Sequence, residues 1–513
     1  MRFDLSITGR LLGLSLLLCL GLHKARGQET FSKFYEMSSV YIQGFTDVYE
    51  LDSTYIVVGS SYDGTPQLVI NLMLIHHNGA LLKHVVLRND TMEIASERLG
   101  KMVRCGEYLY VACFGYTQGV GPSAGLILAI DDTLGIQREI YLDHEPQEEL
   151  LGLTCWRDQY IYAAGYSRPS FLESQDLWFV QLDTAGNVLR DTTIGENVFE
   201  ITVGIDTLPD GRLITAPARN DYFVDGKWNL VIMTLDTALN VLSEVTHTGP
   251  GEFCGGSISY STKGHHYMVG CYDTIIDPVE DPYPYFVSRL SLSGSFIWQH
   301  FLSGIKGSNA LFNLTESESG DVVSVGYYVH DRQDTVNAIR AHIISVDSSG
   351  NRNWYREYYA PANYDYNSEL YDVIQTADGG YLACGRNIRI NGQARAWLLK
   401  LDSMGCLIPG CDTLGIGIGL PPVQLSLDDN LQLYPNPASD QLHLLWRVAP
   451  QQASDIGTYQ LIGMDGRIAL QGQAAGSAGR VLLDVRGLSP GLYTVILQHG
   501  LQRVSSQKVV IGR

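Results

Sequence analysis

A pair of short strands closed by a glycine recurs along most of the chain, and this repeat constrains the fold more than any other sequence feature. Its clearest copy is YDVIQTADGGYLACG, from Tyr371 to Gly385, where an Asp-Gly-Gly turn separates two apolar segments. Six more copies of the same design occur at intervals of about 50 to 60 residues. They close at or near Gly59, Gly115, Gly165, Pro217, Gly270 and Gly326. A period of this length is typical of repeat architectures, in which each repeat is one supersecondary unit.

Each copy is followed by a second pair of strands, as in LWFVQLDTAGNVLRD from Leu177 to Asp191. A tight turn joins the two strands of this second pair, and most of these turns carry glycine, which accepts left-handed backbone at little cost. The turn glycines are Gly79, Gly135, Gly186, Gly294, Gly350 and Gly405. The fourth copy has Leu239-Asn240 at this place, and Asn240 is expected to take the left-handed conformation. Each repeat therefore predicts four short strands.

Four short strands with tight turns between them describe one blade of a β-propeller. A single blade cannot bury both of its faces, whereas seven blades around an axis can, and a closed ring leaves no exposed sheet edge. The sequence therefore predicts an all-β fold with a seven-bladed β-propeller over residues 31–412. A β-solenoid is the alternative, although its coils are usually shorter and more uniform than these repeats. The last repeat lacks an outer strand, and the segment from Phe31 to Met37 is expected to supply it.

The chain changes character after residues 413–430, a predicted linker that contains GIGIGLPP. Beyond it, short alternating strands carry the ordered segments LQLYPNPASDQLHL, YQLIGMDGRIAL, LDVRGLSPGLYTVIL and QKVVI. The motif residues in them are Pro435, Asn436, Pro437, Asp465, Gly466, Arg467, Gly491, Tyr493 and Lys508. In their order and terminal position, these segments resemble the C-terminal sorting domain of type IX secretion system cargo from the Bacteroidota. The resemblance implies a small immunoglobulin-like β-sandwich over residues 431–513, with the type IX secretion machinery as its partner.

Residues 1–27 are predicted to be a signal peptide. Arg2 and Arg10 supply basic charge around the start of an apolar run of twelve residues, Leu11 to Leu22, and the small residues Ala25 and Gly27 follow it. Twelve residues are too few to span a bilayer, and no other stretch is apolar for long enough, so the mature chain is expected to have no membrane span. Together with the sorting motifs, this predicts a protein that passes through the periplasm and is secreted or held at the cell surface.

The net charge limits which partners the protein can have, and the cysteines limit which disulfides it can form. The formal net charge of −20 would repel nucleic acids and anionic membranes, so neither is expected as a partner. Export to an oxidising compartment permits disulfides. Cys406 and Cys411 flank a Pro-Gly turn and form the best local candidate pair. The pairing of the other cysteines stays open, and Cys113 and Cys384 could equally be buried thiols.

Motifs for familiar chemistry are absent from the sequence, which has no GxSxG elbow, HExxH helix or P-loop. The pairs His76-His77 and His265-His266 are not expected to bind metal, because neighbouring residues of a strand point to opposite faces. Two acidic loops, Asp277 to Pro282 and Tyr364 to Glu369, could supply oxygen ligands for calcium. No other cofactor or metal is predicted.

Two functions remain compatible with the sequence. The first is a non-enzymatic surface propeller that binds a glycan or a protein through loops on one face of the ring. Aromatic residues that could stack on sugars are Trp156, Tyr166, Tyr222, Trp228 and Tyr283. The rival is a secreted hydrolase or lyase with its site at the propeller channel, marked by acidic or basic groups that converge on the innermost strands. The sequence leaves enzymatic activity undecided and favours the binding role.

Overall fold

The computed structural model describes most of the chain from Gln28 onward, and the described residues form strands and no helix. They are residues 28–37, 42–62, 67–96, 102–117, 121–142, 147–169, 174–195, 198–202, 204–220, 228–247, 252–254, 257–260, 266–273, 285–302, 309–330, 338–358, 365–389, 394–408, 411, 431–447, 457–463, 467–474, 478–499 and 502–512. Across these ranges, no helix is long and apolar enough to cross a membrane. The predicted signal peptide and the predicted linker lie outside the described residues.

Three antiparallel sheets are formed by the first part of the chain. The first sheet consists of β2 (Ile42–Glu50), β3 (Thr54–Tyr62), β4 (Leu68–His76) and β5 (Leu81–Leu87). The second consists of β6 (Glu93–Ser96), β7 (Val103–Cys105), β8 (Tyr108–Thr117), β9 (Gly121–Ile130) and β10 (Ile136–Leu142). The third consists of β11 (Gln147–Trp156), β12 (Tyr160–Arg168), β13 (Asp176–Asp183) and β14 (Val188–Ile194).

Three further sheets follow along the chain. One consists of β15 (Phe199–Ile201), β16 (Ile205–Thr207), β17 (Leu213–Thr215), β18 (Ala218–Asn220), β19 (Trp228–Leu235) and β20 (Val241–His247). The next consists of β21 (Glu252–Cys254), β22 (Ile258–Tyr260), β23 (His266–Asp273), β24 (Tyr285–Leu290) and β25 (Phe296–Phe301). The last has eight strands, β26 (Asn309–Glu316), β27 (Val322–His330), β28 (Ala338–Val346), β29 (Arg352–Tyr358), β30 (Asp365–Gln375), β31 (Tyr381–Arg389), β32 (Ala394–Leu401) and β1 (Phe31–Tyr35). Its two four-stranded halves meet through one parallel pair, Ile339 with Asn367.

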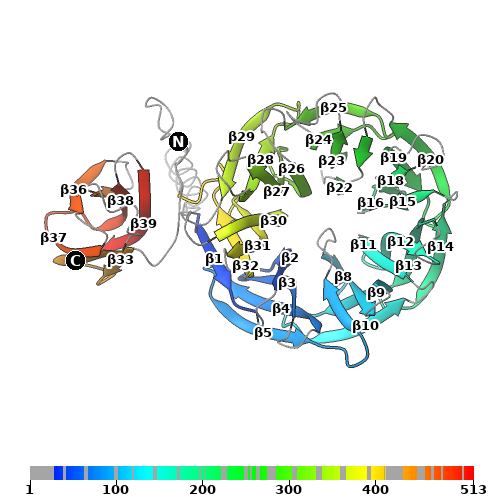
Figure 1. Ribbon diagram of the computed structural model, residues 1–513, viewed down its shortest axis with the longest axis horizontal. Helices are drawn as coiled ribbons and strands as arrows, with labels where there is room; N and C mark the ends of the chain where they lie inside the picture. Colours follow the sequence, from blue (N-terminus) through cyan, green and yellow to red (C-terminus); the bar gives the residue numbers. More distant parts are fainter. Residues whose placement is uncertain are drawn as a thin grey trace, which may run out of the picture.

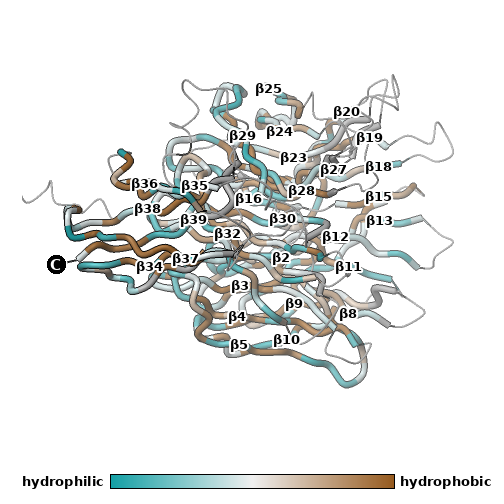
Figure 2. Tube along the Cα trace, turned by 60° about the vertical axis from the view of Figure 1, so that its left-hand side comes forward, coloured by the Kyte–Doolittle hydropathy of each residue, from teal (hydrophilic) through white to brown (hydrophobic). Residues whose placement is uncertain are grey.

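Both faces of each sheet are buried because alternate residues of a strand face opposite neighbours. In β12, Ile161 and Ala163 pack into a core shared with the preceding sheet. Tyr162 and Ala164 pack into a core shared with the following sheet. Hydrophobic residues therefore follow one another along many of the inner strands, as Figure 2 shows.

The sheets lie around a ring (Figure 1), which fits the predicted propeller class and not a linear solenoid. Each described hydrophobic core of this part lies between two units that are consecutive along the chain, with one exception. That core joins Phe45 and Val57 of the first sheet to Leu382 and Leu398 at the end of the repeat region. Packing thus connects the last unit back to the first.

The N-terminal strand completes the final unit, which confirms the predicted pairing of this segment. β1 runs antiparallel to β32, with Phe31 opposite Lys400. The Tyr35 hydroxyl donates to the carbonyl of Gly79 (2.8 Å), and Lys33 Nζ donates to the carbonyl of Asn78 (2.8 Å). One strand therefore closes the last sheet and holds the first sheet beside it.

Two left-handed turn residues differ from the sequence expectation. The left-handed residues are Leu134 (φ 63°) and Leu239 (φ 66°), where Gly135 and Asn240 were expected. In the fourth unit, Asp236 Oδ1 accepts hydrogen bonds from the amides of Ala238 (2.8 Å) and Asn240 (2.9 Å), which fixes the turn. Left-handed backbone costs a leucine about 1–2 kcal/mol. Both leucines are nearly buried, at 2% and 4% exposure, and such burial contributes about 1.5–3 kcal/mol, which offsets the strain.

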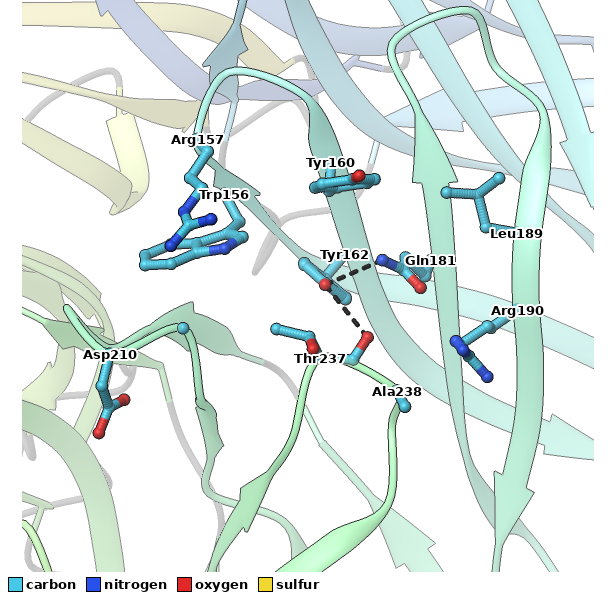
Figure 3. A pocket seen from close by; sticks show the side chains of 11 residues that line it. Trp156, Arg157, Tyr160, Tyr162, Gln181, Leu189, Arg190, Asp210, Thr237 and Ala238 are labelled. Carbon is cyan, nitrogen blue, oxygen red and sulfur yellow. Dashed lines mark hydrogen bonds between the residues drawn. The ribbon is translucent and has the colours of Figure 1, made fainter.

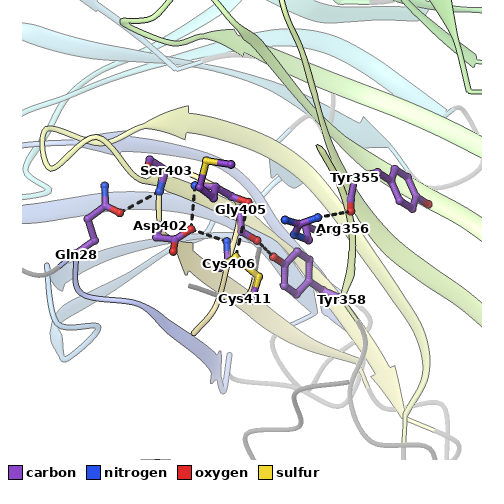
Figure 4. The surroundings of a disulfide bond; sticks show 10 residues. Gln28, Tyr355, Arg356, Tyr358, Asp402, Ser403, Gly405, Cys406 and Cys411 are labelled. Carbon is purple, nitrogen blue, oxygen red and sulfur yellow. Dashed lines mark hydrogen bonds between the residues drawn. A yellow bond between two sulfur atoms is a disulfide. The ribbon is translucent and has the colours of Figure 1, made fainter. Parts of the chain in front are cut away.

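Two disulfides are present among the described cysteines. Cys406 and Cys411 are bonded to each other just after β32, where Asp402 Oδ1 also accepts a hydrogen bond from the Cys406 amide (2.7 Å; Figure 4). Cys105 and Cys155 are bonded across the second and third sheets. Cys113 and Cys384 are buried and are not disulfide-bonded.

The C-terminal strands form two sheets around a core of their own. One sheet consists of β33 (Leu431–Tyr434), β34 (Gln441–Arg447) and β37 (Ala478–Asp484), and the other of β35 (Gly457–Gly463), β36 (Ile468–Ala474), β38 (Gly491–His499) and β39 (Gln502–Ile511). Leu442 and Leu444 from the first sheet pack with Leu461, Val495 and Val509 from the second. All residues of this core come from the C-terminal strands and turns.

The strain at Leu239 predicts an unusual order of mutant stabilities. Leu239→Ala loses core contacts and keeps the left-handed strain, so it should lower the free energy of unfolding by about 2–4 kcal/mol. Leu239→Gly loses similar contacts but relieves the strain, so it should be more stable than the alanine variant by about 1 kcal/mol. Chemical denaturation measures both values. Leu235 of the same core lies in β19 and serves as the control, since there glycine should be worse than alanine. Equal or reversed stabilities at position 239 would contradict the strain.

Candidate functional site

A hollow of about 540 Å³ lies between the third sheet, β11–β14, and the fourth, β15–β20 (Figure 3). Antiparallel strands place the β11–β12, β13–β14, β16–β17 and β19–β20 turns at the same end of these sheets, and residues at or near all four line the hollow. The lining residues are Trp156, Arg157, Tyr160, Tyr162, Gln181, Leu189, Arg190, Asp210, Gly211, Thr237 and Ala238. We call this hollow the Trp156 pocket.

One wall of the Trp156 pocket is a strained turn, which a disulfide and a hydrogen bond hold in place. Arg157 (φ 56°) and Asp158 (φ 53°) are consecutive left-handed residues, and neither is glycine. The disulfide of Cys155 fixes the start of this turn, and the amide of Gly106 donates to Asp158 Oδ1 (3.5 Å). Strained backbone of this kind persists only where surrounding structure holds it, and it clusters at functional sites.

Trp156 and Arg157 present an aromatic and cationic surface to the pocket. The Arg157 guanidinium lies 5.1 Å from the centre of the Trp156 ring, so it covers one face of the indole. Gly211 stands against the ring with φ 92°, and a Cβ there would lie 3.0 Å from the indole. Glycine therefore leaves room for the half-buried Trp156, and a ligand could stack only on the uncovered part of its ring.

A hydrogen-bonded tyrosine forms the inner end of the Trp156 pocket. Tyr162 accepts a hydrogen bond from Gln181 Nε2 (2.9 Å) and donates one to the carbonyl of Thr237 (3.2 Å). Burial raises the pKa of Tyr162 to about 12, so its hydroxyl stays protonated at neutral pH. Tyr162 is therefore a fixed polar contact and not an acid or a base.

Two arginines give the pocket a local charge opposite to that of the chain. Arg157 and Arg190 are both exposed at its rim, whereas the formal net charge of the protein is −20. Asp210, the acid of the lining, forms an ion pair with Arg212 (2.9 Å). Aromatic surface, guanidinium groups and amide groups suit recognition of a sugar ring with acidic substituents. The lining supplies no pair of free acid and base groups for catalysis.

The structure brings only one of the predicted aromatic residues to this pocket. Tyr166 and Trp228 lie toward the other ends of their strands, where the Tyr166 hydroxyl donates to Glu149 Oε2 (2.7 Å). Tyr222 and Tyr283 lie outside the described residues. Sequence reasoning missed Tyr160, Arg157 and Arg190, because a single strand or turn does not reveal what the next sheet places opposite it.

The candidate metal ligands are engaged in other contacts where they are described. The described residues contain no group of three or more His, Cys, Asp or Glu that could hold a metal ion. His77 Nε2 lies 3.0 Å from the carbonyl of Leu51. The second acidic segment is not a loop as predicted, because Glu369 lies within strand β30, where it is paired with Arg386 (3.0 Å). The first acidic loop and His265 lie outside the described residues. His266 begins strand β23.

Small polar residues on the innermost strands form a second cluster, which crosses four units near the centre of the ring (Figure 1). Ser257 Oγ donates to Asn313 Oδ1 (2.8 Å), and Asn313 Nδ2 donates to Asp372 Oδ1 (2.9 Å). Asp372 Oδ2 accepts from the amide of Val48 (3.2 Å). Asp47 is hydrogen-bonded to Asp372 as well. We call these residues the inner network.

Two carboxyl groups meet in the inner network, which is the feature expected of the rival enzymatic function. Burial, followed by the charge of Asp372 and the hydrogen bond to it, raises the pKa of Asp47 well above its usual range. The pair therefore holds a shared proton more readily than two separate carboxyls would. Asp47 and Asp372 are only 4% and 3% exposed, so a polymeric substrate cannot reach them. Their hydrogen bonds link neighbouring units instead.

The sorting-motif residues are placed by the C-terminal sheets. Asn436 Nδ2 donates to the carbonyl of Lys508 (3.1 Å), and its Oδ1 accepts from the amide of Val510 (2.9 Å). These two bonds fasten the exposed turn that includes Pro435 and Pro437 to β39. The bond between Asn436 and Pro437 is cis.

The remaining motif residues mark turns and edges of the same sheets. The Tyr493 hydroxyl donates to the carbonyl of Ser489 (2.9 Å), while its ring packs against the C-terminal core. Gly491 is the exposed first residue of β38, and nothing lies within 4 Å of where its Cβ would be. Arg467 is exposed, and Asp465 and Gly466 lie outside the described residues.

Residues 432–512 match the family described as the secretion system C-terminal sorting domain. The predicted resemblance is thereby confirmed, and the chain is type IX secretion system cargo, exported to the cell surface or the medium. Its partner in export is the type IX secretion machinery. No curated protein is significantly similar to the chain in sequence.

Three solved structures are similar to parts of the chain. The first is PorZ of Porphyromonas gingivalis, a surface component of the type IX secretion system. It is 11% identical in sequence, the match covers 91% of this chain and 81% of PorZ, and the TM-score is 0.24. The β-propeller domain of the Pyrococcus furiosus Trilobed protease is 10% identical in sequence. The match covers 76% of this chain and 100% of that domain, with a TM-score of 0.40. An ulvan lyase of polysaccharide lyase family PL25 is 10% identical in sequence. The match covers 74% of this chain and 96% of the lyase, with a TM-score of 0.47. TM-scores below 0.5 carry no inference about function.

The shared proton of the inner network predicts how stability changes with pH. Because the pKa of Asp47 is raised in the folded state, its contribution is fully present below the unfolded pKa of about 4 and is lost as pH rises through the folded pKa. Asp47→Asn carries no such charge, and its amide can still donate to Asp372. The variant should therefore lose less stability than the wild type between pH 4 and pH 8, as followed by denaturation at each pH.

A turn carboxylate with the opposite shift provides the control for Asp47→Asn. Hydrogen bonds from Asn187 are the main cause that lowers the pKa of Asp183, so its contribution is present above the unfolded pKa and is lost as pH falls. Asp183→Asn should therefore destabilise the protein at neutral pH and have little effect at low pH. Parallel pH profiles for wild type and Asp47→Asn would disprove the shared proton.

Proposed function

We propose that the exported protein is a binding protein that takes an extracellular glycan with acidic groups in the Trp156 pocket. The observation that carries this proposal is the Trp156 and Arg157 pair on a strained turn, with a second exposed arginine, Arg190, across the same pocket (Figure 3). A sugar ring stacks on an indole, and guanidinium groups pair with carboxylate or sulfate groups. Both features occur here on a chain that is otherwise acidic.

The proposed scaffold is a seven-bladed β-propeller over residues 31–412, followed by a linker, 413–430, and an immunoglobulin-like sandwich, 431–513. Seven hydrophobic cores between consecutive units support the blade count, because a ring of seven units has seven contacts. Two C-terminal sheets around one core support the sandwich. The proposed signal peptide is residues 1–27.

The rival function, a hydrolase or lyase at the propeller channel, has less support. Its best candidate groups are Asp47 and Asp372, but these carboxyls are buried and bonded to each other and to the next unit. A binding function needs only the open Trp156 pocket. Protein ligands are a further class that the pocket could accept, and they would remain if neither sugar class binds.

Loss of the indole should abolish most of the proposed binding. Trp156→Ala removes the stacking surface, and because an aromatic contact contributes about 1–1.5 kcal/mol, affinity should fall about tenfold. Calorimetry with uronate-containing and neutral oligosaccharides measures the change. Trp228→Ala, an aromatic of the same two sheets at their other end, is the matched control and should keep full affinity. Equal affinity of all three proteins, or no binding to either sugar class, would refute the glycan site.

Domain boundaries predict the behaviour of a truncated chain. A chain that ends at Asp428 lacks the sorting domain but keeps the repeat region and its own cores, so it should fold and remain in the periplasm. Fractionation of a native-type host locates the protein. A fusion of Leu431 to Arg513 to an inert periplasmic reporter is the reciprocal control and should reach the surface. Surface delivery of the truncated chain as efficient as that of the full chain would place the sorting signal elsewhere.

A further inference from the structure

A row of polar side chains crosses the third and fourth sheets at the end opposite the Trp156 pocket. Ser167 of β12 lies opposite Asp176 of β13 in an antiparallel pair, and such partners share one face of a sheet. Gln175 and Phe199 form a parallel bridge, and the Glu200 amide donates to the carbonyl of Gln175 (2.9 Å). One residue further along both strands, Glu200 therefore stands beside Asp176.

Three oxygen atoms of this row are buried without a hydrogen-bond partner. They are Ser167 Oγ, Asp176 Oδ1 and Glu200 Oε2. Ser167 is 2% exposed and Glu200 is fully buried. Most buried polar atoms in proteins are satisfied, because leaving one unpaired costs about 1–3 kcal/mol. Three such atoms at adjacent positions indicate that something else contacts them.

The charges of the row indicate the sign of the missing partner. Arg219 donates to Glu200 Oε1, but it also pairs with Glu244 (3.4 Å), so one guanidinium is shared by two carboxylates. Asp176 has no ion pair in the described part of the chain. Burial raises the pKa of Asp176, and burial also raises the pKa of Glu200 although the charge of Arg219 opposes that shift.

The geometry points to a divalent cation site, with calcium as the ion, held by Asp176, Glu200 and Ser167. Calcium takes carboxylate and neutral oxygen ligands, tolerates irregular geometry and completes its coordination with waters or backbone carbonyls. Ser167 is the observation that separates this site from a plain acidic pair, because its unpartnered hydroxyl is neutral and lies on the same face. The site differs from both acidic loops considered from the sequence, and it is independent of the glycan pocket.

Such an ion would join two sheets that otherwise meet there through few strand contacts. β15 is only three residues long, and it bridges from β13 of the third sheet to β18 of its own sheet. The cation would fix β15 against β13 at the end opposite the strained turn of Arg157. Its role is therefore structural, and it predicts stabilisation by calcium and not a change of ligand specificity.

Calorimetry and thermal melting of the purified protein, stripped with a chelator, test the site with calcium chloride and with magnesium chloride. Calcium should bind with a dissociation constant of about 1 mM or below, the range of extracellular modules, and raise the melting temperature by roughly 1–3 °C for each tenfold increase above that constant. Magnesium should have a weaker effect. Asp176→Asn and Glu200→Gln should each lose the calcium response.

Asp47→Asn is the matched control, since it changes a buried carboxyl outside the row and should keep the full calcium response. If Glu200→Gln does not fold, Ser167→Ala replaces it and should weaken calcium binding several-fold. The proposal would be overturned if calorimetry shows no heat of calcium binding and the melting temperature does not change at 10 mM calcium, a concentration well above about 1 mM. Asp176 and Glu200 would then be neutralised by protonation and not by a cation. A calcium response that survives in Asp176→Asn would also overturn it, because the ion would then bind elsewhere.

Discussion

Burial of both faces of every sheet is the constraint on which the repeat region depends. A strand such as β12 directs Ile161 and Ala163 to one neighbour and Tyr162 and Ala164 to the other, so neither face can meet water without a large loss of stability. Each unit consequently needs two neighbours, and a linear stack would leave two faces open. The core around Phe45, which joins the first and last units, removes both open faces at once.

The innermost strands also carry polar side chains that link neighbouring units. Thr46 donates to Ser96 Oγ (2.9 Å), and Ser60 contacts the same hydroxyl (2.9 Å). The proposed ligand pocket lies among the turns at one end of the sheets, where strand geometry no longer dictates the residues.

Periodicity made the strands and most of their turns predictable, because each depends on local sequence. Gly186 and Gly350 are left-handed as expected, and the closing role of β1 follows from a strand missing in the last repeat. Leu134 and Leu239 were not predictable, since an aspartate cap and burial in a tertiary core hold them in place. The disulfide between Cys105 and Cys155, and the approach of Gly211 to the Trp156 ring, likewise arise only when neighbouring sheets pack.

Completion of the ring by the N-terminal strand has a consequence for folding kinetics. The Ser32 hydroxyl accepts a hydrogen bond from Trp397 Nε1, and these residues are 365 positions apart in the chain. Closing a loop of that length costs about 5 kcal/mol of chain entropy in its length-dependent part, which no local contact can offset early. The strand therefore docks last, after the whole repeat region has been synthesised, and until then the unpaired edge of β32 stays open to capture by other chains.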